Sequence, residues 1–349
     1  MANWFEVNDD ESKVVISSRI RLARNLIDYP FPNKMKEEES IEVLKKAKDV
    51  IVNGNTVLKD DFKYYKMQDC DEVEKGILLE KHLISKEIME NSNSGVLIKN
   101  DESVSVMINE EDHIRIQTIF PGFKLNEAFD LADKIDDVLE ERLNYAYDER
   151  LGFLTSCPTN IGTGLRASIM VHLPALVELG YIDGVLKAAN QLGLAVRGIY
   201  GENSKALGNI FQISNQLTLG RKEQEIIGNI MGIAKQIIDK ELEARDVLKK
   251  EKGIRFEDRV YRSLGILKSS RIIDTKEAMN HLSNVKLGIE MNFIEEISTR
   301  IIDKLMVDIQ PVHQISMYEA KNVVERDINR ANHIRKTIEL NTKNKEQKS

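Results

Sequence analysis

The stretch C-P-T-N-I-G-T-G-L-R, residues 157–166, decides how the rest of the chain is interpreted. Its two glycines, Gly162 and Gly164, predict a loop whose backbone can come close to a phosphate. The loop lacks the lysine of the G-x-x-x-x-G-K-[ST] phosphate-binding pattern, and that pattern occurs nowhere in the chain. The stretch ends in Arg166, and a guanidinium group is also able to grip phosphate oxygens.

The composition describes a soluble globular protein rather than a disordered one. The chain has 349 residues, of which 42% are apolar and 31% charged, enough for one large domain or two ordinary ones. A net charge of −7 argues against nucleic-acid binding through bulk charge. The first ten residues, MANWFEVNDD, are acidic and unlike a signal peptide, and no apolar run approaches the ~18 residues of a membrane span. We therefore expect no direct nucleic-acid or membrane partner.

The cysteines indicate the compartment. The chain contains two, Cys70 and Cys157, and no C-x-x-C pair. A disulfide framework and a structural zinc site are therefore not expected, and a cytoplasmic location fits this usage.

Hydrophobic periodicity predicts an α+β fold for the first part of the chain. Strict alternation over residues 103–108 and 113–119 predicts two strands joined by the acidic turn N-E-E-D. Amphipathic helices are predicted at 37–52 and 125–143. Further along, the patterns predict strand-like 151–157, a continuation over 166–176, a helix followed by a strand over 185–199, and a closing strand over 209–219.

Helices dominate the remainder. One long helix is predicted at 221–251, followed by helices near 257–267, 275–283, 290–307 and 317–338. The predicted organisation is a mixed domain at 1–252, an all-α domain at 253–340 and a polar, disordered tail at 341–349.

Arginine recurs beside serine, glycine or strand ends, at Arg19, Arg21, Arg115, Arg166 and Arg197. Arg19 and Arg21 are two residues apart, which places them on one side of an extended segment. A guanidinium group grips phosphate oxygens bidentately and stays charged, so several converging arginines would neutralise a triphosphate. Taken singly, each is more commonly a surface or salt-bridge residue.

Acidic residues are the second candidates for chemistry. N-E-E-D-H-I-R places Glu111 and His113 close to an arginine, and Glu202 stands in G-E-N. Solvated turns would explain both carboxylates equally well, and His113 alone is more often a structural hydrogen-bonding residue. Cys157 is either a small buried apolar residue or a thiol activated by donor-rich surroundings.

Four motifs in order resemble the phosphagen (guanidino) kinases. They are S-S-R-I-R, N-E-E-D-H-I-R, C-P-T-N-x-G-T-G-x-R and R-G-x-x-G-E, spread over residues 17–202. Both ends of the chain resemble the bacterial protein-arginine kinases of this family. Only 16 residues precede Ser17, whereas kinases of small guanidines carry a helical domain there. At the other end, R-D-I-N-R-A at 326–331 matches that branch's R-D-x-x-R-A element.

The resemblance implies a phosphagen-kinase-like catalytic domain, with an antiparallel sheet flanked by helices, and in-line transfer of the ATP γ-phosphoryl group to arginine residues of proteins. Magnesium would accompany ATP and keep mostly water ligands, so no protein metal ligand is expected. Glu111 would act as the base, Glu202 as its partner and Cys157 as a contact for the guanidinium. The implied ATP-binding residues are Ser17, Ser18, Arg19, Ile20, Arg21, His82, Arg115, Arg166, Ala167, Ser168, Ile169, Met170, Arg197, Gly198, Ile199, Tyr200, Gly201 and Glu202.

The resemblance also implies regulation and partners. The element Arg326, Asp327, Ile328, Asn329, Arg330 and Ala331 would be an allosteric phosphoarginine site, since Arg326 and Arg330 are an i,i+4 pair. Implied partners are a transcriptional repressor as substrate, a zinc-containing activator protein and Clp protease machinery, in a stress response or protein quality control. Apolar helical stripes could form a homodimer interface or only an internal core.

Two other functions stay open on the sequence. One is a kinase of free arginine or another small guanidine. The other is a catalytically inactive adaptor that reads phosphoarginine, against which the intact Glu111, Arg166 and Glu202 argue.

Overall fold

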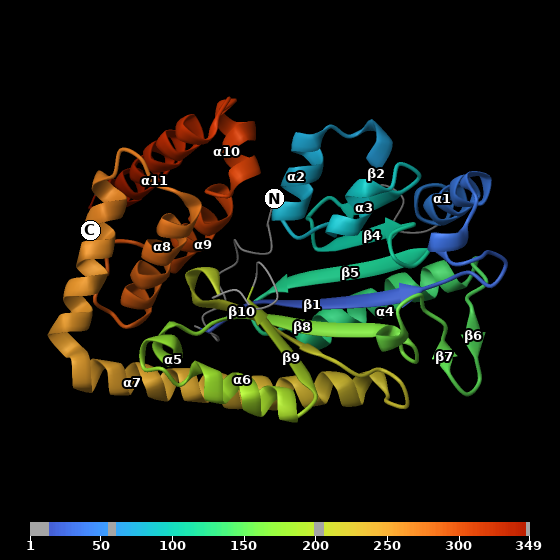
Figure 1. The fold of residues 1–349 in the computed structure, drawn as a ribbon, viewed down its shortest axis with the longest axis horizontal. Coiled ribbons are helices and arrows are strands. Elements are labelled where there is room, and N and C mark those ends of the chain that lie inside the picture. The colour runs from blue at the N-terminus through green and yellow to red at the C-terminus, as the bar shows by residue number, and fades with distance from the viewer. Residues whose placement is uncertain (1–13, 55–60, 199–205, 347–349) are drawn as a thin grey trace.

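The computed structural model describes residues 14–54, 61–198 and 206–346, and it centres on an eight-stranded antiparallel sheet (Figure 1). The strand order is β2-β3-β4-β5-β1-β8-β10-β9. The strands are β1 (Val15–Arg24), β2 (Phe62–Lys66), β3 (Gly95–Lys99), β4 (Val104–Ile108), β5 (Ile114–Pro121), β8 (Leu165–His172), β9 (Leu194–Gly198) and β10 (Ile210–Asn215). This is the α+β architecture that the alternating and amphipathic patterns predicted.

Helices cover one face of the sheet. Helix α4 (Leu125–Glu140) packs on β1 and β5, and α7 (Glu223–Ser269) contacts β8 and β10. Because side chains alternate along β1, Ile20 and Leu22 are buried on the helix-covered face, whereas Arg19 and Arg21 are partly exposed on the other. The remaining helices of this part are α1 (Glu37–Val52), α2 (Glu72–Glu80), α3 (Lys86–Glu90), α5 (Pro174–Glu178) and α6 (Ile182–Gln191).

A helical region follows the sheet and packs against the second half of α7 (Figure 1). It consists of α8 (Thr275–Glu290), α9 (Thr299–Asp308), α10 (Pro311–Tyr318) and α11 (Val323–Glu346). A buried ion pair fastens α7 to α8, because Arg245 of α7 lies 3.0 Å from Glu290 of α8; Arg245 also pairs with Glu241 of its own helix at 2.9 Å. Among the described residues no helix is long and apolar enough to cross a membrane.

The predicted helix boundaries were partly right and partly wrong. The helices predicted at 221–251 and near 257–267 are confirmed as the two parts of α7, which meet at Gly253, whose φ of 2° and ψ of −95° are not helical. The helix predicted at 290–307 begins only at Thr299, as α9, because residues 291–298 form a non-helical connection after α8 in which Asn292 has a positive φ of 61°. The one predicted at 317–338 is divided, because Glu319 ends α10 in the left-handed conformation.

Two further segments differ from expectation. The strand-like stretch 151–157 contributes only β7 (Gly152–Phe153), which pairs with β6 (Tyr147–Asp148) in a separate two-stranded sheet. The rest of that stretch bends away, and the Thr155 hydroxyl donates to the carbonyl of Cys157 at 2.8 Å. Helix α11 runs to Glu346, so it includes residues 341–346, which the composition placed in a disordered tail.

Candidate active site

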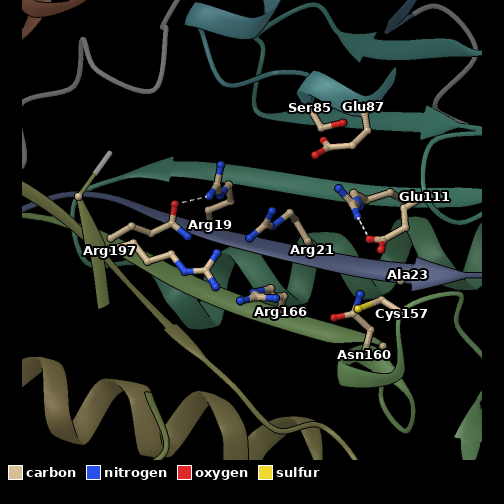
Figure 2. A pocket seen from close by; sticks show the side chains of 14 residues that line it. Arg19, Arg21, Ala23, Ser85, Glu87, Glu111, Cys157, Asn160, Arg166 and Arg197 are labelled. Atoms are coloured by element: carbon tan, nitrogen blue, oxygen red, sulfur yellow. Dashed lines mark hydrogen bonds and ion pairs between the residues drawn. The ribbon is translucent and has the colours of Figure 1, made fainter. Parts of the chain in front are cut away.

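The face of the sheet opposite α4 and α7 carries a cavity of about 750 Å³ (Figure 2), beside the smaller core that α2 and α3 form over β3 and β4. It contains all five arginines singled out in the sequence, together with Glu111 and Cys157. The lining residues are Arg19, Arg21, Ala23, Ser85, Glu87, Glu111, Arg115, Cys157, Asn160, Gly164, Arg166, Arg197, Gly198 and Gln212. The structure therefore brings together residues up to 193 positions apart in the chain, such as Arg19 and Gln212. We refer to this space as the arginine cavity.

Strand register explains why the arginines converge. In the β1–β8 pair, Arg21 lies directly opposite Arg166, and in the β1–β5 pair Ala23 lies opposite Arg115. All three arginines alternate with buried apolar residues, so they share the face opposite α4 and α7. Like charges directly opposite one another destabilise a sheet, so this register has a cost that a bound anion would remove.

The arginine cavity is rich in positive charge. Burial lowers the pKa of Arg19 to about 10, with further contributions from the charges of Arg115 and Arg166. Burial likewise holds the pKa of Arg21 well below its usual range, and its neighbours Arg19, Arg115 and Arg166 lower it further. The Nε of Arg21 is buried and makes no hydrogen bond within the described chain. A polyanion such as a nucleotide triphosphate would supply the missing counter-charge.

Gln212 is a lining residue that the sequence analysis missed. The Nη2 of Arg19 donates to its Oε1 at 2.7 Å, and it stands opposite Arg197 in the β9–β10 pair. Gln212 therefore orients Arg19 without neutralising it. The only signal in the sequence is a polar residue at one position of an otherwise buried strand.

The acidic turn after β4 separates two carboxylates with different surroundings. The side chain of Glu110 has no exposed surface and accepts from Arg115 Nη1 at 2.6 Å and from the Ser85 hydroxyl at 2.5 Å. The side chain of Glu111 is 41% exposed and accepts from Arg115 Nη2 at 3.1 Å. Glu110 thus holds the turn in place, whereas Glu111 is accessible to a substrate.

The pKa of Glu111 is raised, which suits a proton acceptor. Burial is the main cause, the Arg115 guanidinium opposes it, and the carboxylates of Asp112 and Glu110 add to it. A base whose pKa lies closer to neutrality takes a proton more readily from a weak acid such as guanidinium.

Asp112 and Asn25 connect the acidic turn to the loop of Cys157. The Oδ1 of Asp112 accepts from Asn25 Nδ2 and from the backbone N–H of Ser156, both at 2.7 Å. The neighbouring His113 accepts from the Leu26 N–H through Nδ1 at 2.9 Å, so its Nε2 donates to the carbonyl of Pro30. Both ring nitrogens are occupied, and His113 has the structural role that the sequence left as an alternative.

The glycines of the 157–166 stretch are required by contacts with the protein's own backbone. A Cβ on Gly162 would lie 2.7 Å from the carbonyl oxygen of Thr218, and one on Gly164 would lie 2.6 Å from that of Ala23. Both have positive φ, 112° and 65°. Of the two, only Gly164 lines the arginine cavity. The expectation that both glycines bring backbone to a phosphate is therefore corrected: their first role is to let the loop pack closely.

Cys157 begins the short 3-10 turn Pro158–Asn160, and its Sγ lies 3.1 Å from the Thr159 hydroxyl. In Figure 2, Cys157 and Glu111 lie at one end of the cavity, whereas Arg19 and Arg197 lie at the other. The cavity thus has an acidic, thiol-bearing end and an arginine-rich end.

Other predicted ATP-binding residues lie in different surroundings. Ile20, Ala167 and Ile169 are buried on the helix-covered face, so their side chains do not reach the cavity. Apart from the five arginines, Gly198 is the one predicted ATP-binding residue of the described chain that lines the cavity. Ser17, Ser18, Ser168 and Met170 are buried, and Ile199, Tyr200, Gly201 and Glu202 lie outside the described residues.

His82 lies next to the cavity rather than in its lining. It has a positive φ of 59°, and its carbonyl accepts from Gln117 Nε2 at 2.8 Å. Burial lowers its pKa to about 4, and the charge of Arg19 lowers it further, so the imidazole is neutral near pH 7. A neutral, partly buried ring beside an arginine of the cavity is suited to contact with an aromatic ligand.

Arg326 and Arg330 of α11 have different surroundings from the arginines of the cavity. Arg330 is completely buried, and it donates to the carbonyls of Ile309 at 2.8 Å and Ile273 at 2.9 Å and to the carboxylate of Asp327. Among the described residues, the Nη2 of Arg330 is buried and makes no hydrogen bond. The same holds for the Nε of Arg326. Arg330 therefore has one nitrogen, Nη2, whose two N–H groups make no hydrogen bond in the described chain, whereas the side chain of Arg326 is half-buried.

No group of three or more His, Cys, Asp or Glu side chains in the described ranges could hold a metal ion.

Comparison with known proteins gives the family. Residues 42–244 match the family model described as ATP:guanido phosphotransferase, C-terminal catalytic domain, and residues 253–349 match that described as protein-arginine kinase McsB C-terminal domain. The chain is 49% identical to the protein-arginine kinase of Caldanaerobacter subterraneus subsp. tengcongensis, over 95% of this chain and 98% of that protein. It is 46% identical to the protein-arginine kinase of Clostridium kluyveri, over 98% of this chain and 100% of that protein.

A solved structure agrees with this relationship. The crystal structure of lombricine kinase superposes with a TM-score of 0.59 at 26% sequence identity, covering 68% of each chain. A family model covering more than half the chain and relatives covering nearly all of it lead to one conclusion. The chain belongs to the ATP:guanido phosphotransferase family, in the branch of the protein-arginine kinases.

Proposed function

We propose that the protein transfers the γ-phosphoryl group of ATP to the guanidinium group of arginine residues in proteins. The observation that carries this proposal is the arginine cavity, where five arginines converge beside the accessible carboxylate of Glu111. Relatives nearly as long as the chain, named protein-arginine kinases, support the choice of arginine in proteins as the acceptor.

The arginines supply what phosphoryl transfer needs. The transition state requires in-line positioning and neutralisation of charge more than covalent help. Arg19, Arg21 and Arg166 are rigidly placed by the sheet, and their mutual repulsion falls when the triphosphate binds. Magnesium bound to ATP would screen the phosphate oxygens.

Glu111 is the proposed base at the other end of the cavity. A guanidinium is fully protonated near neutral pH, so it must lose a proton as its nitrogen attacks the phosphorus. A carboxylate can hold the planar group through paired hydrogen bonds and accept that proton. Glu202, which lies outside the described residues, is the proposed second carboxylate. Cys157 lies at the same end as Glu111 and is proposed to contact the guanidinium without forming a covalent intermediate.

The acceptor can be tested directly. We expect label from γ-labelled ATP to enter a mixed protein substrate and to be lost in hot acid, because N–P bonds are acid-labile. Glu111→Gln should lower the rate by about 10²–10⁴-fold while leaving ATP affinity within about twofold. Label that enters only free arginine would instead identify a kinase of small guanidines. Absence of transfer by the unchanged chain, with phosphoarginine bound by the helical region, would identify an adaptor.

The helical region is the proposed binding site for phosphoarginine, through Arg326 and the Nη2 of Arg330, which makes no hydrogen bond in the described chain. Arg326→Ala should abolish activation by a phosphoarginine peptide and leave ATP affinity unchanged, because Arg326 lies outside the arginine cavity. The matched control is Arg262→Ala, since the side chain of Arg262 is 75% exposed on α7. Equal activation in Arg326→Ala and the unchanged protein would refute this role.

The wider setting is proposed on the family resemblance. We propose a catalytic domain at 1–252, a regulatory domain at 253–340, and a cytoplasmic protein that acts in stress response or protein quality control. A transcriptional repressor as substrate, a zinc-containing activator, Clp protease machinery and a homodimer are the proposed partners. The break in α7 at Gly253 supports the boundary between the domains.

A further inference from the structure

The helical region contacts the sheet-containing part of the molecule at α2, and the carboxylate of Glu80 lies at this contact (Figure 1). Glu80, the last residue of α2, faces the first turn of α10. Its Oε1 accepts from the Val312 N–H at 2.8 Å, and its Oε2 accepts from the His313 N–H at 2.9 Å and from His313 Nδ1 at 2.7 Å. Glu80 thus satisfies backbone donors that a helix start leaves without partners, and its charge suits the positive end of α10.

The backbone packing at this contact is close. A Cβ on Gly76, one turn earlier in α2, would lie 2.7 Å from Val312 Cγ1. Figure 1 shows α2 and α10 next to each other, although more than 230 residues of chain separate them, with Glu80 and His313 233 positions apart. The absence of a side chain at residue 76 is what allows α10 to approach α2 this closely.

Helix α2 ends in a strained turn at His82. The N–H of Leu83 donates to the carbonyl of Leu78, and that of His82 donates to Leu79, both at 2.9 Å. This is the Schellman arrangement, in which glycine normally occupies the left-handed position that His82 takes here. A non-glycine residue in this conformation costs about 1 kcal/mol or more and persists only where its surroundings enforce it.

Two contacts from outside the helix fix this turn. Gln117 of β5 holds the carbonyl of His82, and Glu80 ties the last turn of α2 to α10. Helix α10 is itself fixed to the helical region, because Gln314 Nε2 donates to the Asp308 carbonyl at 2.7 Å. Arg330 in addition holds the carbonyl of Ile309 just before α10.

We propose that Glu80 is a positioning residue for phosphoryl transfer: through it, α10 clamps the end of α2 and keeps His82 in the conformation that contacts the nucleotide. This inference rests on the proposed function, in which ATP occupies the arginine cavity beside His82. It gives the helical region a direct part in nucleotide binding, separate from the binding of phosphoarginine.

The first test is Glu80→Gln in the full chain, with ATP affinity measured by calorimetric titration. One amide oxygen cannot replace two carboxylate oxygens, and the amide NH₂ would face the donors of α10. We expect the Kd for ATP to rise by at least about fivefold and kcat at saturating ATP to change by less than about twofold. The matched control is Glu72→Ala on the same helix, where the side chain is 83% exposed; its Kd should be unchanged.

A second variant approaches the same contact from the packing side. Gly76→Ala improves the helix propensity of α2 but pushes Val312 away. We expect it to raise the Kd for ATP in the same way while Glu80 stays in place. Because the two variants disturb the contact by different means, a folding defect in one of them leaves the other as the test.

A double-mutant cycle separates positioning from general support of the fold. Glycine adopts the left-handed conformation without strain, so His82→Gly no longer needs the clamp. In that background, Glu80→Gln should change the Kd for ATP by less than about twofold. An equal loss of affinity in both backgrounds would overturn the proposal, as would unchanged ATP affinity in Glu80→Gln. Failure of the unchanged chain to bind ATP would instead overturn the proposed function and this inference with it.

Discussion

The arginines of the cavity and the arginine of α11 carry the same group in opposite surroundings. Arg21 and Arg166 face each other across two strands and share a space with three more guanidinium groups. Arg330 is completely buried but bonded to Asp327 and two backbone carbonyls. An arginine whose partners are protein groups serves the fold, whereas arginines whose neighbours are mainly other arginines indicate a bound anion.

This difference has an energetic consequence. The cavity keeps like charges together at a cost in stability, which is the arrangement expected where a site is prepared for a ligand. Arg330 contributes stability only as long as its partners are present. Substitution by alanine should therefore lower activity but not stability at a cavity arginine, and should lower stability at Arg330.

The largest effect is expected for Arg166→Ala. Loss of one guanidinium that neutralises the transferring phosphate should lower kcat/KM by about 10³-fold or more. The melting temperature should stay the same or rise, because burial and the charge of Arg197 already make the charged form of Arg166 unfavourable, as its lowered pKa indicates. Steady-state kinetics and a thermal melt measure the two quantities.

A ligand shift provides the control for Arg166→Ala. Saturating ATP should stabilise the unchanged protein, by about 2.7 kcal/mol at a hundred times its Kd, and should stabilise the variant less. The exposed Arg262→Ala variant should match the unchanged protein in both assays. A variant that melts several degrees lower while keeping its activity would show that Arg166 serves the fold, and the comparison would fail.

The opposite pattern is expected for Arg330→Ala. Its removal leaves Asp327 and the carbonyls of Ile309 and Ile273 without their donor, which should lower the free energy of unfolding by about 3–5 kcal/mol. Arg326→Ala should cost less than about 1 kcal/mol, because that side chain is only half-buried. Urea titration of both variants measures the difference. Equal losses would mean that the buried contacts of Arg330 contribute nothing beyond those of an ordinary surface residue.

The sequence predicted the elements with a strong local pattern. Helix α1 matches the prediction at 37–52 because its apolar residues recur at helical spacing. The turn at Asn292 and the left-handed Glu319 were missed, because an isolated positive φ leaves no periodic signal. Local patterns thus locate elements better than they locate the breaks between them.

The site could be predicted only in part, for a related reason. Glu111 and Cys157 were found through their motifs, and the structure places both in one cavity. Gln212 and Glu80 were missed because each acts through a partner far along the chain, Arg19 and Val312 respectively. Which side chains come into contact depends on strand order and domain packing, and a short stretch of sequence predicts neither.

The smallest effect concerns the acidic end of the cavity. Glu111 has a raised pKa, so its carboxylate becomes protonated at a higher pH than an ordinary glutamate, and kcat/KM should fall as pH falls through that value. The charge of Glu87 is one of the weaker causes, after burial and the neighbours Asp112 and Glu110. Glu87→Gln should therefore lower the pKa of Glu111 and move the acidic limb of the profile to lower pH.

The pH profile of kcat/KM measures this shift against a close control. Glu90 lies on the same short helix as Glu87 but does not line the cavity, so Glu90→Gln should leave the limb in place. A limb that moves to higher pH in Glu87→Gln would contradict the electrostatic explanation. A limb that does not move in Glu87→Gln, but disappears in Glu111→Gln, would mean that the charge of Glu87 does not contribute to the pKa of the base. The acidic end would then differ from the arginine-rich end, where neighbouring charges and burial act together.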